Sequence, residues 1–202
     1  MTRPAGSRDR VLACAREMFY QVGYHSTSVD DVLKGCGVAK SNFYYHFESK
    51  EALATAVLDQ RIAEFETLLS LTLSNPMLSP VLQLRSFLEA VCEAHSSNKL
   101  GGCPLGNFAA SLANDTAEAA QNRFRTSIAA LFDRLFAAAE ACLALGAARG
   151  EFRGDVAPAQ LATVLVAGVQ GLLLVSKTRQ DAGYASMCAS ALIALFQTVE
   201  QK

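Results

Sequence analysis

The stretch SVDDVLKGCGVAKSNFYYHFESK, at residues 28–50, decides the fold of the N-terminal part of this chain. Ser28 is followed three residues later by Asp31, a spacing that predicts a capping box at the start of a helix. Gly37 permits the left-handed backbone that ends such a helix and turns the chain sharply. A second short helix is predicted over residues 40–47. The stretch therefore predicts two short helices joined by a tight glycine turn.

The second of these helices has an unusual outer face. Phe43 and Phe47 stand four residues apart and are expected to point inward. The other side chains are amides, hydroxyls, an imidazole and an ammonium, which suit base edges and phosphates in the DNA major groove; they belong to Lys40, Ser41, Asn42, Tyr44, Tyr45 and His46. The other interpretation is an ordinary solvated helical hairpin, and the spacing alone leaves both open.

The stretch and its flanks resemble the DNA-binding head of the TetR family of bacterial repressors. The resemblance rests on GVAKSNFYYHF at residues 37–47 and SKEAL at 49–53, with Ala15, Phe19 and Gly23-Tyr24 upstream. It implies an all-α fold, with a three-helix helix-turn-helix head over residues 1–53. A helical ligand-binding and dimerisation domain would follow over residues 54–202.

The resemblance also implies roles for individual residues. Tyr44, His46 and Lys50 would contact phosphates or bases, and Thr27 or Ser28 would touch the DNA backbone. The groove would be faced by Lys40, Ser41, Asn42 and Tyr45. Asp30 departs from the family pattern, because many members carry a neutral or basic residue there. An acid near DNA is unfavourable unless a neighbour such as Lys34 screens it.

Composition favours helices and gives DNA binding only weak electrostatic support. Half of the 202 residues are apolar, and few of them alternate as strands require. Residues 1–50 hold seven basic and five acidic side chains, a net charge of +2, whereas the whole chain has a net charge of −1. Phosphate binding would therefore depend on individually placed contacts rather than on a strong basic field.

The six cysteines are scattered, without CxxC spacing and without a histidine at metal-ligand spacing. No metal and no cofactor are expected. The polar start and the scattered thiols predict a cytoplasmic protein. The longest apolar run, 161–175, is interrupted by Gln170 and two glycines and falls short of the roughly 20 residues that span a membrane. No membrane partner is expected.

Further helices are predicted after the head. Ser7 is expected to cap a first helix that ends at Gly23, and Ser49 to cap the helix that follows the hairpin. Later helices are predicted over residues 82–95, from Pro104, over 115–145, from Pro158 and over 184–199. The last two are expected to pair with a second copy in a homodimer, because the 161–175 helix is apolar all round and rich in small residues: Ala162, Ala167, Gly168 and Gly171. The alternative is an internal core helix.

Cys103 is the main candidate for chemistry. It precedes Pro104, which fits the first position of a helix, so its thiol would lie where the helix dipole favours the thiolate. The segment resembles a Gly-Cys-Pro-Leu-Gly-Asn element of one TetR subgroup, some of whose members sense electrophiles through this cysteine. The alternative is a purely structural helix start. Candidates to meet an apolar effector are His95, Phe65, Phe108, Asn107 and Gln170. The alternatives are a helix-capping or solvent-facing histidine, amides that satisfy backbone groups, and ordinary core aromatic residues.

An enzyme is not expected, because phosphate loops, nucleophile elbows and HExxH motifs are absent from the sequence, and no catalytic residue is assigned. The sequence predicts a transcriptional repressor that a small apolar or electrophilic effector releases from a palindromic double-stranded DNA operator. The alternative from another class is a helical ligand-binding or scaffolding protein without DNA activity.

Overall fold

The computed structural model describes residues 6–97, 101–111 and 119–197. Within these ranges every named element is an α-helix, and the only β-type pairing there is an isolated bridge between Phe152 and Gln197. This confirms the predicted all-α fold. The chain forms two compact units, which we call unit 1 (residues 1–63 and 104–128) and unit 2 (residues 64–103 and 129–202).

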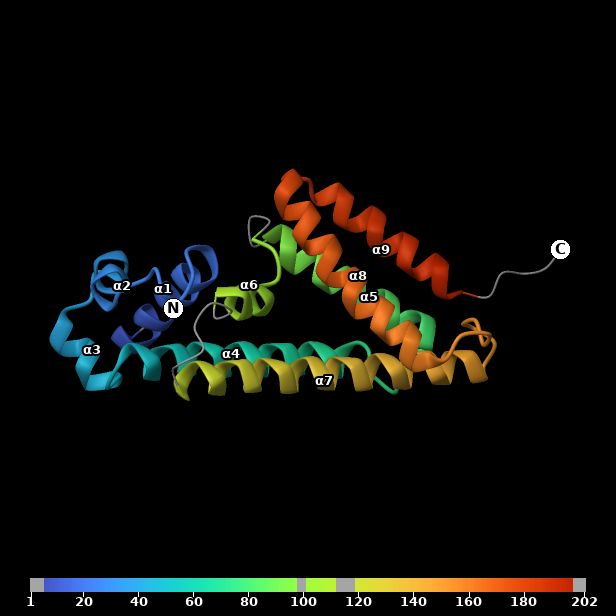
Figure 1. The fold of residues 1–202 in the computed structure, drawn as a ribbon, viewed down its shortest axis with the longest axis horizontal. Coiled ribbons are helices and arrows are strands. Elements are labelled where there is room, and N and C mark those ends of the chain that lie inside the picture. Colours follow the sequence, from blue (N-terminus) through green and yellow to red (C-terminus); the bar gives the residue numbers. More distant parts are fainter. Residues whose placement is uncertain (1–5, 98–100, 112–118, 198–202) are drawn as a thin grey trace, which may run out of the picture. The chain divides into compact units, whose positions relative to one another are not determined.

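Unit 1 contains the predicted three-helix head. Its helices are α1 (Ser7–Gln21), α2 (Val29–Cys36) and α3 (Lys40–His46), which pack against one another (Figure 1). A fourth helix, α6 (Pro104–Ser111), packs against α1 although it lies far along the chain. Unit 1 also holds the first turns of α4 (Lys50–Leu71) and α7 (Ala119–Ala148).

Aromatic side chains join these distant segments of unit 1. The ring of Tyr24, in the turn after α1, lies 5.5 Å from Phe19, 5.8 Å from Phe108 of α6 and 5.6 Å from Phe124 of α7, between ring centroids. All four rings are buried. Edge-on aromatic pairs at these distances are favourable beyond the area that they bury. We call this set the aromatic cluster.

Of the three serines predicted to cap helices, Ser28 and Ser49 are confirmed and Ser7 is not. Ser28 and Asp31 form the predicted capping box, and the backbone N–H of Ala52 donates to Ser49 Oγ at the start of α4 (3.0 Å). Ser7 does not cap α1, because Gly6 occupies the N-cap position and Ser7 is already the first helical residue. The Ser7 hydroxyl is instead used in a tertiary contact that is described below.

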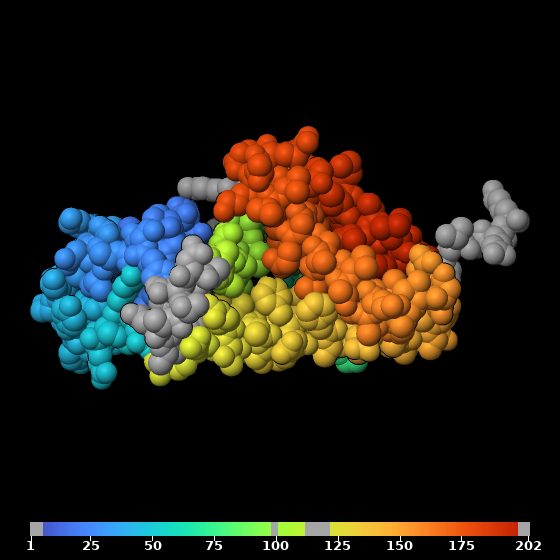
Figure 2. All heavy atoms as spheres, in the orientation of Figure 1, coloured from blue at the N-terminus to red at the C-terminus, as the bar shows by residue number. Residues whose placement is uncertain are grey.

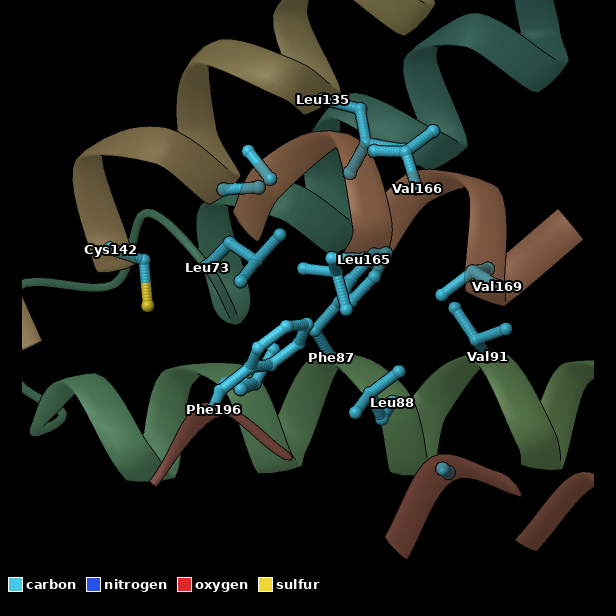
Figure 3. Packing of buried hydrophobic residues seen from close by; sticks show 14 of the residues in the cluster. Leu73, Phe87, Leu88, Val91, Leu135, Cys142, Leu165, Val166, Val169 and Phe196 are labelled. Atoms are coloured by element: carbon cyan, nitrogen blue, oxygen red, sulfur yellow. The ribbon is translucent and has the colours of Figure 1, made fainter. Parts of the chain in front are cut away.

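Unit 2 is built around α5 (Pro80–Ser97), α8 (Pro158–Arg179) and α9 (Ala182–Phe196). The α9 helix packs against both others, and α8 and α9 run side by side in opposite directions (Figure 1). Leu88 and Val91 of α5 point toward Leu165 and Val169 of α8 in the buried core (Figure 3). Contacts of this kind supply most of the stability of helical domains.

Two details of unit 2 were not predicted. The α9 helix begins at Ala182 rather than Tyr184, because the Asp181 carboxylate accepts from the backbone N–H groups of Gly183 and Tyr184. Gly146 in α7 lies under the buried ring of Phe152, where any larger residue would clash: an added Cβ would lie 2.0 Å from the ring. The predicted start of α7 at Asp115 lies outside the described residues.

The α8 helix is longer than the apolar run predicted. At 22 residues it has the length and composition of a membrane-spanning helix. However, Leu165, Val169 and Leu172 on one side are buried within the core of unit 2. Core helices of water-soluble proteins share this composition.

Candidate nucleic-acid interface

The α3 helix is held to the head by its aromatic residues and presents its polar side chains outward. Phe43 is fully buried and Phe47, which follows the last turn, is 4% exposed. The remaining residues of the predicted reading face are exposed, namely Lys40, Ser41, Asn42, Tyr44 and Tyr45. Tyr45 is the most open of these, at 84%. A short helix fixed from one side thus exposes hydrogen-bonding groups and flat rings on the other.

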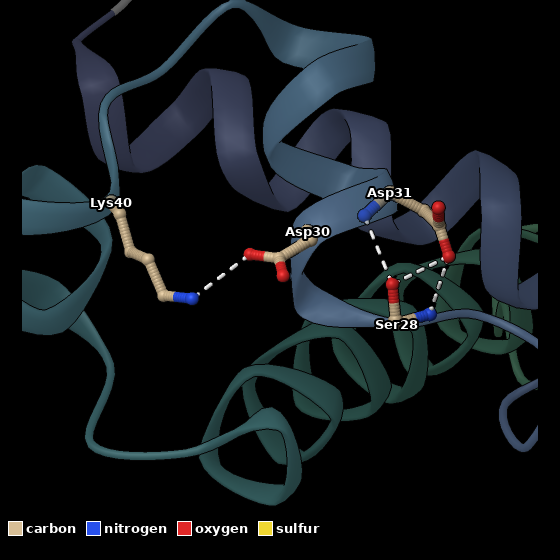
Figure 4. Close-up of polar contacts among 4 residues, drawn as sticks. All are labelled: Ser28, Asp30, Asp31 and Lys40. Carbon is tan, nitrogen blue, oxygen red and sulfur yellow. Dashed lines mark hydrogen bonds and ion pairs between the residues drawn. The ribbon is translucent and has the colours of Figure 1, made fainter.

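Lys40 is paired with Asp30 rather than free. Its Nζ lies 3.1 Å from a carboxylate oxygen of Asp30, which links the start of α3 to α2 (Figure 4). The hydrogen bond and charge of Asp30 raise the pKa of Lys40. The neighbour that screens the charge of Asp30 is therefore Lys40. Both side chains are about 60% exposed, so the pair is weak and can open.

Ser28 and Asp31 form a closed hydrogen-bonded pair at the start of α2. The Asp31 N–H donates to Ser28 Oγ (3.1 Å), and both the Ser28 N–H (3.0 Å) and hydroxyl (2.6 Å) donate to the Asp31 carboxylate (Figure 4). These bonds lower the pKa of Asp31. They fix the first turn of α2, where the N–H groups at the start of the helix lack partners within the helix itself.

Two of the predicted DNA-contacting residues are used inside the head. Thr27 is 1% exposed, and its hydroxyl donates to the carbonyl of Gly23 at 2.8 Å. His46 is half-buried, and its Nε2 lies 2.9 Å from Ser7 Oγ, within hydrogen-bonding distance. Thr27 therefore fixes the corner between α1 and α2, and His46 ties the end of α3 to the start of α1.

Two cations lie over aromatic rings of the head. The Lys50 ammonium, at the first residue of α4, is 4.3 Å from the ring centroid of Tyr24. The Arg8 guanidinium, in the first turn of α1, is 5.5 Å from that of Phe47. Sequence reasoning named Lys50 but missed Arg8, which is exposed beside the end of α3. The basic start of the chain was the available signal, but only the fold shows that it reaches α3.

The candidate effector residues are divided between the two units. Asn107 and Phe108 belong to unit 1, where Phe108 is part of the aromatic cluster. Phe65 and Cys103 are partly buried against the core of unit 2. Gln170 is half-buried on α8, also in unit 2. The sequence had grouped these residues only by their chemical type.

His95 is the most unusual polar residue in unit 2. It is 3% exposed, and its Nε2 lies 3.0 Å from the hydroxyl of Ser176 on α8. That hydroxyl donates to the carbonyl of Asp181 (2.6 Å), so it accepts from His95, which places the imidazole proton on Nε2. His95 Nδ1 is then a buried acceptor that has no hydrogen-bond partner among the described residues. Burial lowers the pKa of this histidine, which favours the neutral ring.

The outer faces of α8 and α9 are apolar. They form one continuous surface of unit 2 (Figure 2, orange and red) and expose large apolar side chains: Val164, Leu174, Val175, Met187 and Leu195. The sequence predicted burial of α8 on all sides, but in one chain this side is open. Of the small residues predicted for the interface, Gly171 lies on the open side, with free space around it. Gly168 faces Leu192 of α9 in the same chain.

Both parts of the chain resemble a known protein family. Residues 11–57 match the family model described as bacterial regulatory proteins of the tetR family, and residues 80–192 match the tetracyclin repressor-like C-terminal domain. The chain belongs to the TetR family. It is therefore a DNA-binding transcriptional regulator and not an enzyme. Regulators of this family bind DNA operators and typically act as dimers, which argues against a helical scaffold without DNA activity.

Individual relatives agree over nearly the whole chain. It is 29% identical to the transcriptional repressor DhaR of Mycobacterium sp. strain GP1, over 86% of this chain and 84% of DhaR. A TetR regulator from Chloroflexus aurantiacus J-10-FL is 27% identical, with a TM-score of 0.77 and coverage of 93% and 92%. The regulatory protein TetR from Rhodobacter sphaeroides shares the fold, with a TM-score of 0.81, 22% identity and coverage of 94% and 98%.

Proposed function

We propose that this regulator is a cytoplasmic repressor that binds a palindromic operator as a homodimer and leaves it when an effector reaches the C-terminal region, residues 54–202. The observation that carries the proposal is the exposed polar and aromatic face of α3, fixed from behind by Phe43 and Phe47. Such a helix is too short to be stable alone. Its rigid mounting on α1 and α2 is what a helix needs to read base edges.

Within this proposal the head residues divide into two groups. Tyr44, Tyr45, Ser41 and Asn42 enter the groove, where the amide of Asn42 offers both a donor and an acceptor and therefore suits adenine. Lys40, Lys50 and the N-terminal turn of α2 at Ser28 contact phosphates. Thr27 and His46 act by holding the corner and the end of α3, as their bonds to Gly23 and Ser7 indicate.

The homodimer would form through the open sides of α8 and α9. Val164, Leu174 and Val175 on α8 and Met187 and Leu195 on α9 would be covered by the same residues of a two-fold mate, giving a four-helix bundle. Two heads related in this way read half-sites about 34 Å apart. Covering these side chains would supply the hydrophobic free energy of association.

The effector signal would reach the head through α4 and α6. The α4 helix begins at Lys50, beside Tyr24, and continues without a break into unit 2. The α6 helix begins at Pro104, directly after Cys103, and places Phe108 against Tyr24. A shift of α6 would therefore change the support of the turn between α1 and α2. An effector must bind the two arrangements unequally for this coupling to work.

Two triggers fit the C-terminal region. One is reversible binding of a small apolar molecule that meets Phe65, Gln170 and Nδ1 of His95, a buried acceptor without a partner in the described part of the chain. The other is covalent modification of Cys103 by an electrophile, as in the subgroup that shares the Gly-Cys-Pro-Leu-Gly-Asn element. In either case Asn107 and Phe108, both near the start of α6, would carry the change to the head.

Sequencing the DNA that the purified protein captures from genomic fragments tests the proposal directly. We expect one palindromic sequence to dominate, and affinity for it to fall steeply as salt increases. Binding that shows no preference among sequences, or no dependence on salt, would contradict it.

Substitution of Cys103 separates the two triggers. Cys103→Ser keeps a side chain able to cap a helix and should bind the operator normally. If an alkylating agent such as N-ethylmaleimide releases the parent protein but not this variant, the thiol is the sensor. Cys188→Ser, which removes another partly exposed thiol, is the matched control and should respond as the parent does. Release of the Cys103→Ser protein would leave non-covalent binding as the trigger.

A further inference from the structure

Three sulfur atoms gather between α1 and α2 in the head. Cys14 and Met18 lie one turn apart on α1, with Cys14 Sγ 3.9 Å from Met18 Sδ. Cys36, the last residue of α2, has its thiol close enough to that of Cys14 to influence its ionisation, and it donates to the carbonyl of Leu33 at 3.7 Å. All three side chains are partly exposed. This cluster could not be predicted from the sequence, because Cys14 and Cys36 are far apart in the chain and thioethers are absent from common ligand motifs.

Gly35 makes this approach possible. A Cβ at this position would lie 2.7 Å from Cys14 Sγ and 3.8 Å from Met18 Sδ, so the space that a side chain would fill is occupied by the sulfurs. Glycine within a helix costs about 1 kcal/mol relative to alanine. The eight-residue α2 helix thus contains a residue that lowers helix stability, and this residue lies where Cys14 Sγ of α1 approaches the α2 backbone.

We propose that Cys14, Met18 and Cys36 form a binding site for a soft monovalent cation, Cu(I). Thiolate and thioether sulfurs are the donors that select Cu(I) over harder ions. With metal–sulfur bonds of about 2.3 Å, three sulfurs around one trigonal ion lie ~4 Å apart, close to the 3.9 Å between Cys14 and Met18. Structural zinc requires four ligands, and no cluster of three or more His, Cys, Asp or Glu side chains occurs in the described part of the chain.

Binding would link the two helices that support α3. The two thiols release their protons to the solvent and bind Cu(I) as thiolates, and the Met18 thioether coordinates as a neutral ligand, so no oxidation state changes. Because the ligands come from both α1 and α2, the ion binds the folded head more tightly than the unfolded chain. It therefore raises the unfolding temperature by mass action.

The test uses the full-length reduced protein in an oxygen-free buffer, with Cu(I) alone as the probe and the chromophoric chelator bicinchoninate as competitor. The parent should retain one equivalent of Cu(I) at chelator concentrations that strip the Cys14→Ser/Cys36→Ser variant. Cys92→Ser/Cys188→Ser is the matched control, because it removes the other pair of neighbouring thiols and should leave this equivalent in place.

Met18→Leu tests the third ligand with a conservative change of volume. The affinity of the variant for Cu(I) should fall at least about tenfold, because even mutations of residues that only support metal ligands typically cost this much. The copper X-ray absorption edge should change from a three-coordinate to a two-coordinate form. Circular dichroism checks that each variant keeps the helical content of the parent.

Three results would overturn the site. One is equal copper retention by the parent and the Cys14→Ser/Cys36→Ser variant. The second is a Met18→Leu protein with unchanged affinity and absorption edge. The third combines two findings: peptide mapping shows a disulfide between Cys14 and Cys36 in protein purified in air, and the reduced protein takes up no copper. The pair would then be a redox dithiol that binds no metal.

Discussion

The outer faces of α3 and of the α8–α9 pair are both exposed in one chain, yet their chemistry is opposite. The α3 face offers an ammonium, a hydroxyl, an amide and two phenols, and the rings of Tyr44 and Tyr45 are its apolar surface. The α8–α9 face offers Val164, Leu174 and Met187, which are between 48% and 63% exposed. Water solvates the first face well and the second poorly.

The difference shows which kind of partner each face suits. Hydrogen-bonding groups held on a rigid helix can exchange water for base edges and phosphates at little net cost, so α3 suits a polar polyanion. Apolar groups gain most from an equally apolar surface, so the α8–α9 face suits a second copy of itself. Substitutions on both faces and at the start of α2 test this assignment and the support of the head, from the largest expected effect to the smallest.

Leu174→Asp should abolish the dimer. Leu174 is 63% exposed in one chain, so the substitution is harmless to the isolated fold. In a two-fold interface it would bury an unpaired carboxylate from each subunit, at about 3–5 kcal/mol each. Sedimentation should show a folded monomer, and operator affinity should fall at least about 100-fold, since 1.4 kcal/mol corresponds to a factor of ten.

Two glycines on α8 provide a second test of the interface and a control for it. Gly171→Leu adds a side chain on the open face and should also impair dimerisation. Gly168→Leu instead forces a side chain against Leu192 within the chain, where even a Cβ would lie 2.9 Å away, and should lower the unfolding temperature. A dimeric Leu174→Asp protein would place the interface elsewhere.

Tyr44→Ala should weaken operator binding by roughly tenfold, the loss expected for one or two well-placed contacts, without unfolding the head. The side chain is 53% exposed and packs edge-on against Phe43. Fluorescence anisotropy with labelled operator measures the loss, and the circular dichroism spectrum should not change. Parental affinity would show that this face of α3 does not enter the groove.

Ser28→Ala should destabilise the head by about 1 kcal/mol, the usual cost of a lost N-cap. Ser28 lowers the pKa of Asp31 in the folded protein. The ionised carboxylate therefore contributes its full share of the folding stability above pH 3.8, its ordinary pKa, and this share is lost as the pH falls through the lowered pKa of the folded state. Urea unfolding at neutral pH and at pH 3 measures both states. A stability difference that does not shrink in acid would contradict the role of Asp31.

Asp30→Asn should change DNA binding least, and in the opposite direction. It releases Lys40 from the ion pair and removes an acid close to the proposed phosphate contacts. Operator affinity at low salt should rise by roughly two- to threefold, the scale of an exposed ion pair. The gain should vanish in Asp30→Asn/Lys40→Ala, whose salt slope should also be shallower by about one. An equal gain in the double variant would remove Lys40 from the phosphate contacts.

The sequence by itself determined the all-α fold, the family and the local geometry of the head. The Ser28–Asp31 capping box, the left-handed Gly37 and the Ser49 cap follow from interactions between residues at most four apart, so their signals lie within a few positions of the chain. Phe43 and Phe47 were predicted to face inward for the same reason, since helical periodicity alone decides it.

Only the tertiary structure decided which distant residues meet. It paired His46 with Ser7, Lys40 with Asp30 and His95 with Ser176, and it brought Cys14 beside Cys36. It also separated Gly168, packed inside the chain, from Gly171, which lies open. Such pairings depend on how helices pack once their apolar faces are buried. Because that packing sums many weak contacts between segments far apart in the chain, no local pattern of residues encodes it.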